Sequence, residues 1–332
     1  MRALRLAGPA PIAARPLLAA LLPDPEPGPG EIVVRVRACA ICRTDLHVVE
    51  GELPPKRPAI IPGHQVVGLV ERRGPGAARF AIGDRVGIAW LRSTCGACPD
   101  CRRGDENLCV HSRYTGWDED GGYAERAVVR EDFAYPIPPA FSDADAAPLL
   151  CAGIIGYRAL RRSRVEPGGR LGLWGFGSSA HITLQVARAR GCEVYVSTRG
   201  ESHRRLALSL GAAWAGDAAE PPPVPLDGAI LFAPVGSLVP PALRALRRGG
   251  TLALAGIYLT PIPSLTYEDH LFHEKALTSV EANTRRDGEE LLVEAAKIPI
   301  RPKTRQYALS DANQALIDLK NDAIDGTGVL IP

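Results

Sequence analysis

Short apolar strands alternate with helices between residues 170 and 255, and this alternation constrains the fold more than any other feature of the sequence. Alternation at this spacing is typical of βαβ units, whose strands form a parallel sheet. The sequence therefore predicts an α/β domain with a parallel sheet. Its predicted strands are 170–174, 193–197, 229–233 and 251–255, and its predicted helices are 152–162, 178–190, 202–210 and 240–248.

The first half of the chain has a different pattern. Segments rich in β-branched residues, at 31–38, 66–71, 85–89 and 123–129, are separated by loops containing glycine and proline. They predict a mostly-β domain. A length of 332 residues exceeds what one core usually organises, so two domains are expected. We place the first domain at 1–152, the second at 153–284, and a return to the first at 285–332.

Composition excludes several classes of function. The net charge is +2, which leaves no basic surplus for a nucleic-acid partner. No uninterrupted apolar run is long enough to span a bilayer. Prolines interrupt the apolar N-terminal stretch, and no cleavage site follows it, so we predict a cytoplasmic protein without a leader.

A glycine-rich turn follows the strand 170–174 and opens the next helix. Gly175 permits a tight turn, Gly177 lets the backbone approach a pyrophosphate, and Ala180 allows close packing of helix on strand. Free N–H groups at the start of the helix, at Ser178 and Ser179, suit an anion. We predict a dinucleotide site here, the alternative being an ordinary strand–helix turn.

The end of the strand 193–197 bears on which nucleotide binds. An NAD enzyme normally places Asp or Glu there to hold the ribose 2′-hydroxyl, whereas this chain has Ser197, Thr198 and Arg199. Hydroxyls and an arginine suit a 2′-phosphate, with help from Arg204, so we predict NADP(H) in preference to NAD(H). The alternative is that Arg199 is a solvated surface charge.

Four cysteines within a lobe at about 93–111 form the first metal-binding pattern, and they are Cys95, Cys98, Cys101 and Cys109. Four thiolates make a closed tetrahedral site, so we predict a structural zinc. An iron–sulfur cluster is the competing interpretation, but the bacterial ferredoxin pattern ends with three residues between its last cysteines and a proline. Arg102 and Arg103 would offset the negative charge of the cluster.

A second pattern combines Cys42, His64 and Cys151. Two thiolates and one imidazole are a recorded ligand set for a catalytic zinc that keeps one position open. Such a metal stabilises an alkoxide, which favours deprotonation of an alcohol. Only Cys39 and Cys192 are left without a ligand role, and we expect both to be buried packing residues.

The residues beside Cys42 suit proton transfer. Asp45 is expected to accept a hydrogen bond from the second ring nitrogen of His64, and Thr44 has a hydroxyl that both donates and accepts. An imidazole side chain can take up and release a proton near neutral pH, and His47 is expected to pass the proton to solvent. The structural alternatives are that Thr44 and Asp45 form a simple helix cap and that His47 is a surface residue.

The order and spacing of these motifs resemble the zinc-dependent alcohol dehydrogenases of the medium-chain dehydrogenase/reductase superfamily, over the full length of the chain. The resemblance implies a GroES-like catalytic domain, a Rossmann domain, a cleft between them for zinc and nicotinamide, and a homodimer or homotetramer. Trp90 looks like the pocket aromatic of relatives that act on small alcohols. Arg43 matches a position that touches the cofactor pyrophosphate in some relatives.

Three positions depart from the family pattern. Gln65 follows Gly63-His64 where relatives have Glu, which puts any exchange of metal ligands in doubt. Ile155 replaces a Thr that often lies against the nicotinamide, and Thr198 replaces the acid at the strand end.

We therefore predict an enzyme with two zinc ions per chain that transfers a hydride between NADP(H), or NAD(H), and primary alcohols or aldehydes. A secondary-alcohol, polyol or cinnamyl-type dehydrogenase on the same scaffold is the alternative within this class. A zinc-free quinone reductase is disfavoured because both ligand sets are intact. From another class, the alternative is an NADP(H)-binding redox sensor whose zinc is only structural.

Overall fold

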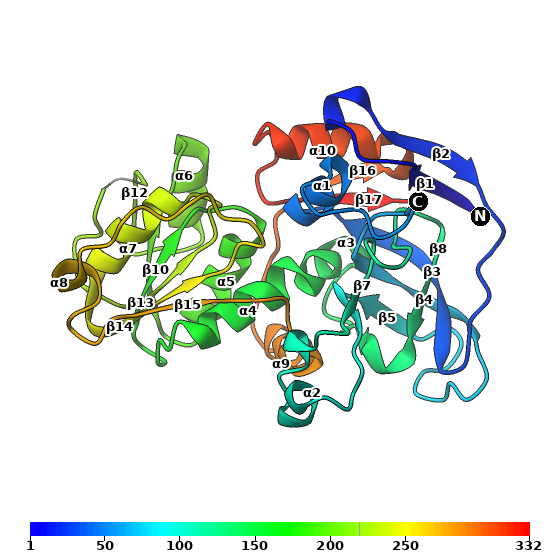
Figure 1. The fold of residues 1–332 in the computed structure, drawn as a ribbon, viewed down its shortest axis with the longest axis horizontal. Coiled ribbons are helices and arrows are strands. Elements are labelled where there is room, and N and C mark those ends of the chain that lie inside the picture. The colour runs from blue at the N-terminus through cyan, green and yellow to red at the C-terminus, as the bar shows by residue number, and fades with distance from the viewer. Residues whose placement is uncertain (219) are drawn as a thin grey trace. The chain divides into compact units, whose positions relative to one another are not determined.

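The chain is folded as two compact units in the computed structural model, which describes residues 1–218 and 220–332 (Figure 1). The first unit comprises residues 1–151, 283–296 and 302–332, and the second comprises 152–282 and 297–301. The sequence-based boundaries lie beside these ones, except that 297–301 belongs to the second unit and not to the first.

The second unit is built on a parallel sheet whose described strands have the order β12-β11-β10-β13-β14-β15. This is the doubly wound order of a Rossmann fold, in which the chain reverses direction across the sheet between β10 and β13. The strands are β10 (Arg170–Trp174), β11 (Glu193–Ser197), β12 (Trp214–Gly216), β13 (Leu226–Leu231), β14 (Leu246–Leu254) and β15 (Ala276–Ser279).

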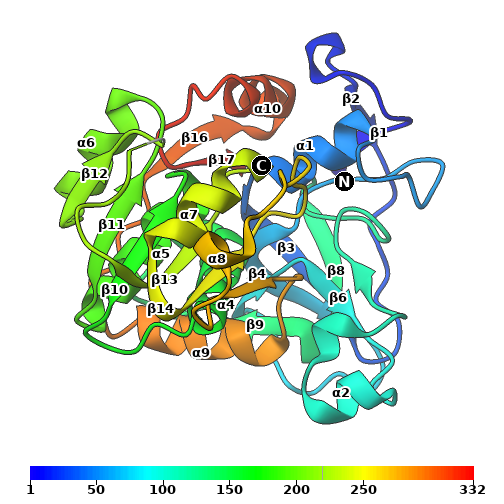
Figure 2. The ribbon, with the colours of Figure 1, turned by 60° about the vertical axis from the view of Figure 1, so that its left-hand side comes forward.

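Helices cover this sheet, and α4, α5 and α7 each bury an apolar side. α4 and α5 pack against each other. α7 packs on β13 and β14, in front of the sheet in Figure 2. Trp174, Leu231 and Leu243 are among the buried residues of the core beneath α7. The helices of this unit are α4 (Ala152–Arg162), α5 (Ser178–Ala189), α6 (Glu201–Ser209), η5 (Gly236–Leu238), α7 (Val239–Ala245) and α8 (Tyr267–His270).

The predicted helix 240–248 is wrong at its C-terminal end. α7 stops at Ala245, and the next residue, Leu246, is buried in extended conformation and pairs with Leu226 as the start of β14. Lys275 helps to end the helix, since its ammonium donates to the carbonyl of Leu243 at 2.8 Å. Lysine near a helix C-terminus satisfies carbonyls that the helix itself leaves unbonded.

The first unit is built on a mainly antiparallel sheet of order β16-β17-β3-β4-β5-β9, with β8 also paired to β3. The C-terminal strand β17 pairs with β3 directly before Cys42, where Ile41 N–H donates to Gly328 at 2.9 Å. The strands are β1 (Arg2–Leu6), β2 (Leu17–Leu21), β3 (Glu31–Ala40), β4 (Gln65–Arg73), β5 (Arg85–Ile88), β6 (Leu91–Ser93), β7 (Arg113–Tyr114), β8 (Arg126–Arg130), β9 (Ala134–Pro136), β16 (Thr304–Ala308) and β17 (Thr327–Ile331).

Short helices connect these strands, and α1 packs against α10. They are η1 (Ile12–Ala14), α1 (Arg43–Glu50), α2 (Pro99–Arg103), η2 (Glu106–Leu108), η3 (Glu131–Phe133), α3 (Asp143–Ala146), η4 (Ala147–Leu150), α9 (Arg285–Ala295), η6 (Leu309–Asp311) and α10 (Ala312–Lys320). The predicted strand 123–129 begins later, at Arg126, because Tyr123 bonds backbone groups of Leu4 and Pro62 outside that ladder.

The predicted combination of a mostly-β unit and a Rossmann-type α/β unit is confirmed. In the part of the chain that the structure describes, no helix is both long and apolar enough to cross a membrane.

Candidate active site and metal centres

α1 starts at Arg43 because its N-terminus is capped from both sides. The Asp45 carboxylate accepts the backbone N–H of Cys42 at 2.8 Å, and the Cys42 side chain faces the N–H of Asp45 in a reciprocal capping box. Such a box satisfies N–H groups that the first helical turn leaves unbonded. The cap therefore fixes Cys42 where β3 ends.

Cys42, His64 and Cys151 come together in the first unit, from the ends of three different segments. Their ligand atoms all lie within 4.8 Å of one another, and Cys42 Sγ is 3.4 Å from His64 Nε2. His64 is buried, whereas both cysteines are partly exposed. Two thiols and an imidazole at this spacing fit a tetrahedral zinc with one open position.

The Asp45 carboxylate also reaches His64, with Oδ1 3.0 Å from Nδ1. Burial lowers the pKa of His64, but the charges of Asp45 and Cys42 outweigh it and raise the value to about 10. A carboxylate on Nδ1 fixes the tautomer that presents Nε2 as a ligand. Asp45 is thus both a helix cap and a partner of the imidazole, so the two sequence interpretations of this residue describe one arrangement.

The two thiols of this site interact with each other. A hydrogen bond with Cys151 lowers the pKa of Cys42 well below its ordinary value, and the same bond raises that of Cys151. One thiolate is therefore favoured beside the imidazole even without an ion. Thiolate is the form of cysteine that binds a metal.

The other residues of α1 that were predicted to belong to the site make the following contacts. The Thr44 hydroxyl interacts with the Cys42 thiol and is half-buried. His47 Nδ1 is hydrogen-bonded to Glu52. The guanidinium of Arg43 forms an ion pair with Asp322 at 2.8 Å. To bind a pyrophosphate, Arg43 would have to give up this ion pair.

Two buried polar side chains flank His64, a candidate metal ligand. The Gln65 amide is fully buried and, among the described residues, neither its oxygen nor its nitrogen has a hydrogen-bond partner. Tyr123 is a residue that the sequence analysis missed, and burial and the charge of Asp45 raise the pKa of its phenol. Its ring packs on Gly63, where φ is +97° and an added Cβ would lie 2.3 Å from the ring. Only glycine fits before His64.

Trp90 lies beside the same metal ligand. Its ring meets that of His64 edge-on, with centroids 4.9 Å apart and planes at 71°. Tyr114 and Trp117 stack on Trp90, and the sequence analysis identified neither of them. Their signal in the sequence was weak, because single aromatic residues in loops usually have a packing role.

The second candidate metal centre consists of the four cysteines of the lobe. The sulfurs of Cys95, Cys98, Cys101 and Cys109 lie within 4.8 Å of one another, which fits a closed tetrahedral metal site. Backbone N–H groups of Ala97 and Cys98 lower the pKa of Cys95 to about 6. The lobe is tied to α9 because Glu106 accepts four hydrogen bonds from three N–H donors of Arg285, at 2.6 to 3.0 Å.

All eight cysteines of the chain are free thiols. The two without a predicted ligand role, Cys39 and Cys192, are buried. A packing role therefore agrees with their positions.

The glycine turn lies in the second unit, at the carboxyl end of β10, beside the point where the strand order reverses. Gly175 has φ of +86°, and a Cβ there would lie 2.9 Å from the backbone of Ala233. Gly177 has open space around its Cα and precedes α5, whose first residues are Ser178 and Ser179. This geometry fits the pyrophosphate of a dinucleotide at a helix N-terminus.

The neighbouring strand end carries the residues predicted to choose between cofactors. Ser197 and Thr198 are buried, whereas Arg199 is exposed. Arg204 pairs with Glu201 at 3.1 Å and with Asp217 at 3.5 Å. Arg204 is therefore partly neutralised, so a 2′-phosphate would have to compete with these two carboxylates for it.

Two family models match the chain. The alcohol dehydrogenase GroES-like domain matches residues 28–139, and the zinc-binding dehydrogenase domain matches residues 180–297. The first match contains six of the seven predicted metal ligands, all except Cys151.

Individual relatives cover nearly the whole chain. A probable alcohol dehydrogenase of Mycobacterium tuberculosis is 57% identical, over 100% of this chain and 97% of its own. A cinnamyl alcohol dehydrogenase structure from Sorghum bicolor has a TM-score of 0.90 at 27% identity, covering 99% of this chain and 97% of that one. The structure of CAD from Helicobacter pylori with NADP(H) has a TM-score of 0.87 at 26% identity, covering 100% and 99%.

Proposed function

The chain belongs to the zinc-dependent alcohol dehydrogenases of the medium-chain dehydrogenase/reductase superfamily, and we propose that it interconverts primary alcohols and aldehydes with NADP(H). One observation carries the proposal: Cys42, His64 and Cys151 have ligand atoms within 4.8 Å of one another. When bound, zinc would polarise the substrate oxygen, and nicotinamide would exchange a hydride with the substrate carbon.

Asp45 positions the histidine of this set. Its bond to Nδ1 leaves Nε2 directed at Cys42, 3.4 Å away, which is the side from which a shared ion would be held. The N–H of Cys42 holds the other carboxylate oxygen at 2.8 Å, so the carboxylate cannot rotate without losing a hydrogen bond. The ligand geometry is thus set by the backbone of α1 as well as by the side chains.

Thr44 and His47 are proposed to move the proton of the alcohol. The Thr44 hydroxyl interacts with the Cys42 thiol and would accept the proton at Oγ1 while donating its own. His47 lies one helical turn further on and is bonded to Glu52 through Nδ1, so we assign the transfer toward solvent to Nε2. The carboxylate of Glu52 would stabilise the imidazolium during that transfer.

The preference for NADP(H) is proposed from the end of β11. The chain has no acidic side chain at residues 197–200, where an NAD enzyme would hold the ribose hydroxyls, and it has the exposed Arg199 instead. The Helicobacter pylori structure bound to NADP(H) supports the same cofactor. An arginine–phosphate contact is a strong, charge-assisted hydrogen bond.

The test measures the oxidation of NADPH and of NADH with a panel of small aldehydes. We expect turnover with a preference for NADPH over NADH. In Arg199→Ala this preference should fall about 10- to 100-fold, because a charge-assisted hydrogen bond to the 2′-phosphate is lost. Arg286→Ala, which removes an exposed arginine of α9 in the other unit, is the matched control. If the wild-type enzyme prefers NADH, the protein is still a dehydrogenase, but the predicted preference for NADPH is wrong.

Two alternatives are separated by related measurements. Similarity to the Sorghum bicolor enzyme favours cinnamyl alcohols as a second substrate class, and they belong in the same panel. A redox sensor with only structural zinc would bind NADP(H) without turnover. If Cys151→Ser keeps full catalysis, the zinc mechanism is wrong, since a ligand of the proposed catalytic ion has been removed.

A further inference from the structure

A buried imidazole connects two short helices of the second unit. His270 is the last residue of α8 and is only 4% exposed. Its Nδ1 lies 2.8 Å from the carbonyl oxygen of Thr266, and its Nε2 lies 2.9 Å from Nη1 of Arg244 in α7. The two helices lie beside each other, as Figure 1 and Figure 2 both show. We call the contact between Arg244 and His270 the latch.

The two partners of this ring determine which form of the imidazole fits between them. A carbonyl can only accept a hydrogen bond, so Nδ1 carries the proton that is donated to Thr266. A guanidinium can only donate, so Nε2 offers its lone pair to Arg244. The latch therefore requires the neutral ring. A second proton would remove this acceptor and place two cations 2.9 Å apart.

The charged groups around the latch do not compensate for a second proton on the ring. Both charged side chains that bond α7 to the segment containing α8 are cations, because Lys275 donates to the carbonyl of Leu243 at 2.8 Å and to that of Asp269 at 3.4 Å. Burial lowers the pKa of Lys275, while the charge of Asp269 raises it. The carboxylates of Glu268 and Asp269 lie on an exposed side of α8, where water screens them. The remaining charged and titratable groups of these elements are Tyr267, His273, Glu274, Arg247 and Arg248.

The latch holds one end of the segment between β14 and β15, residues 255–275. The other end is tied to the loop after β13, because the N–H of Gly236 donates to the hydroxyl of Thr260 at 2.8 Å. Between these two ties the segment carries exposed apolar side chains, which are Ile257, Tyr258, Ile262, Tyr267 and Phe272. It buries little apolar surface of its own, so its order depends on the contacts near its ends.

We propose that the latch is a pH-sensitive conformational switch, in which protonation of His270 releases α8 from α7 and loosens residues 266–275. The contact is present while the imidazole is neutral and is lost as the pH falls and the ring takes up a proton. Lys275 still holds the segment to Leu243, so the release is local and does not unfold the unit. This inference goes beyond the proposed function, because it concerns a segment of the second unit whatever the substrate is.

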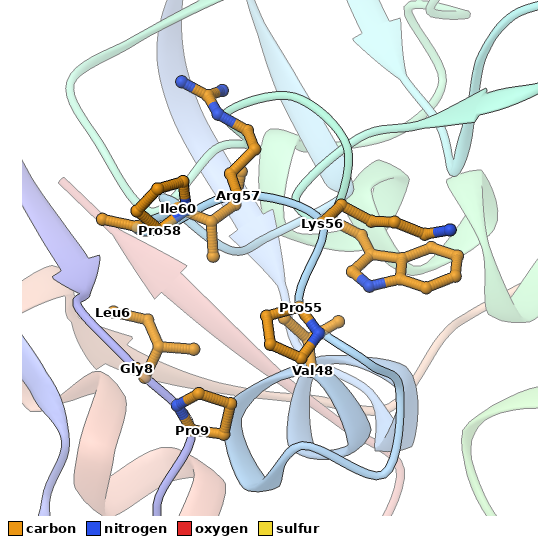
Figure 3. A pocket seen from close by; sticks show the side chains of 11 residues that line it. Leu6, Gly8, Pro9, Val48, Pro55, Lys56, Arg57, Pro58 and Ile60 are labelled. Carbon is orange, nitrogen blue, oxygen red and sulfur yellow. The ribbon is translucent and has the colours of Figure 1, made fainter.

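Hydrogen exchange followed by mass spectrometry tests the switch in the full-length protein, at about pH 8 and at about pH 5. Each rate is divided by that of the unfolded chain at the same pH, since chemical exchange itself depends on pH. We expect the protection of residues 267–275 to fall about tenfold at the lower pH, the effect of losing one hydrogen bond to a charged group. Residues 55–60 line the recess drawn in Figure 3, include Lys56 and Arg57 but no histidine, and should keep their protection.

His270→Gln separates the latch from a general effect of acid. A neutral amide can donate to Thr266 and accept from Arg244 without titrating, so the protection of this variant should be equal at both pH values. His273→Gln is the matched control, since it removes a neighbouring imidazole, whose ring lies 5.1 Å from that of Phe272, and should keep the wild-type pH dependence.

Arg244→Met is the second variant, and it is decisive if His270→Gln fails to fold. It removes the cation of the latch, so residues 267–275 should be loosened to the same extent at both pH values. Wild-type protection that does not change with pH overturns the proposal. So does a pH dependence of wild-type size that survives in folded His270→Gln or Arg244→Met.

Discussion

The Asp45 carboxylate has two structural roles, one for each of its oxygens. One oxygen accepts the backbone N–H of Cys42, and the other contacts Nδ1 of His64. Burial raises the pKa of Asp45, while the charge of His64 lowers it, so the carboxylate depends on the imidazole as much as the imidazole depends on it. Loss of such an outer partner of a metal ligand typically weakens metal binding about 10- to 100-fold.

Asp45→Asn is expected to weaken zinc binding about 10- to 100-fold, because a neutral amide supports the His64 ring less well. Competition with a chromogenic chelator measures the affinity directly. Asp84→Asn is the control, since Asp84 also accepts a backbone N–H, from Ala81, but lies on an exposed turn. Equal affinities in the two variants would show that Asp45 acts only as a helix cap.

The sequence identified the residues of this site better than their surroundings. Cys42, His64 and Cys151 were predicted together, and the structure brings their ligand atoms within 4.8 Å of one another. Tyr123 and Trp117 could not be predicted, because they reach the site through contacts between distant segments. Thiols and imidazoles have few structural uses that require close spacing, whereas an aromatic ring fits almost any core.

At the scale of the elements, the contact that holds the start of α9 in place could not be predicted from the sequence. Glu106 of η2 is 179 residues away from Arg285, and its buried carboxylate accepts the backbone N–H and the guanidinium of that arginine. Glu106 raises the pKa of Arg285. Arg285 also lies over the ring of Phe133, with its guanidinium carbon 4.5 Å from the centroid. The cysteine lobe, η3 and the start of α9 are thus joined by one side chain.

Glu106→Gln is expected to lower the free energy of unfolding of the first unit by about 1–3 kcal/mol, since the half-buried guanidinium of Arg285 loses its buried, charged partner. Glu290→Gln tests the same chemistry on the surface of α9, where Arg286 and Glu290 pair at an exposed i, i+4 spacing. That variant should lower the free energy of unfolding by no more than about 0.5 kcal/mol. Denaturant unfolding measures both, and equal costs would contradict the role assigned to Glu106.

Element boundaries show where sequence patterns fail. The run after Val239 continues with good helix formers past Ala245, so periodicity alone extended the helix to 248. The helix ends earlier because Leu246 gains a strand partner in Leu226 and Lys275 caps the helix carbonyls. Both partners come from other parts of the second unit, and no local pattern encodes them.

At the scale of the whole molecule, the alternation of strands and helices was sufficient to predict the Rossmann-type unit. The predicted parallel sheet is confirmed, with the doubly wound strand order. The assignment of residues 297–301 to that unit was missed. Gln185 side-chain groups bond both the N–H and the carbonyl of Arg301, at 2.9 and 3.3 Å, and a contact of this range has no signature in the sequence.

Metal removal is expected to affect the two units differently. Cys95, Gly96, Ala97 and Pro99 are exposed, so the lobe has little apolar core, and we expect it to depend on a bound ion. Cys98→Ser should therefore lower the unfolding temperature of the first unit. Calorimetry should show the transition of the second unit unchanged, and NADPH fluorescence should show its binding retained. A parallel fall of both transitions would mean that the units unfold as one.

The two metal centres also differ in how much of the chain must exist before each can form. The ligands of the lobe lie between residues 95 and 109, whereas those of the other centre lie between 42 and 151. Closing a short loop costs less entropy than closing a long one. In addition, β3, which leads into Cys42, pairs with β17 at residues 329 and 330. During synthesis on the ribosome, the lobe can bind its ion while the chain is still growing. The other centre gains the support of β17 only after residues 329 and 330 have emerged.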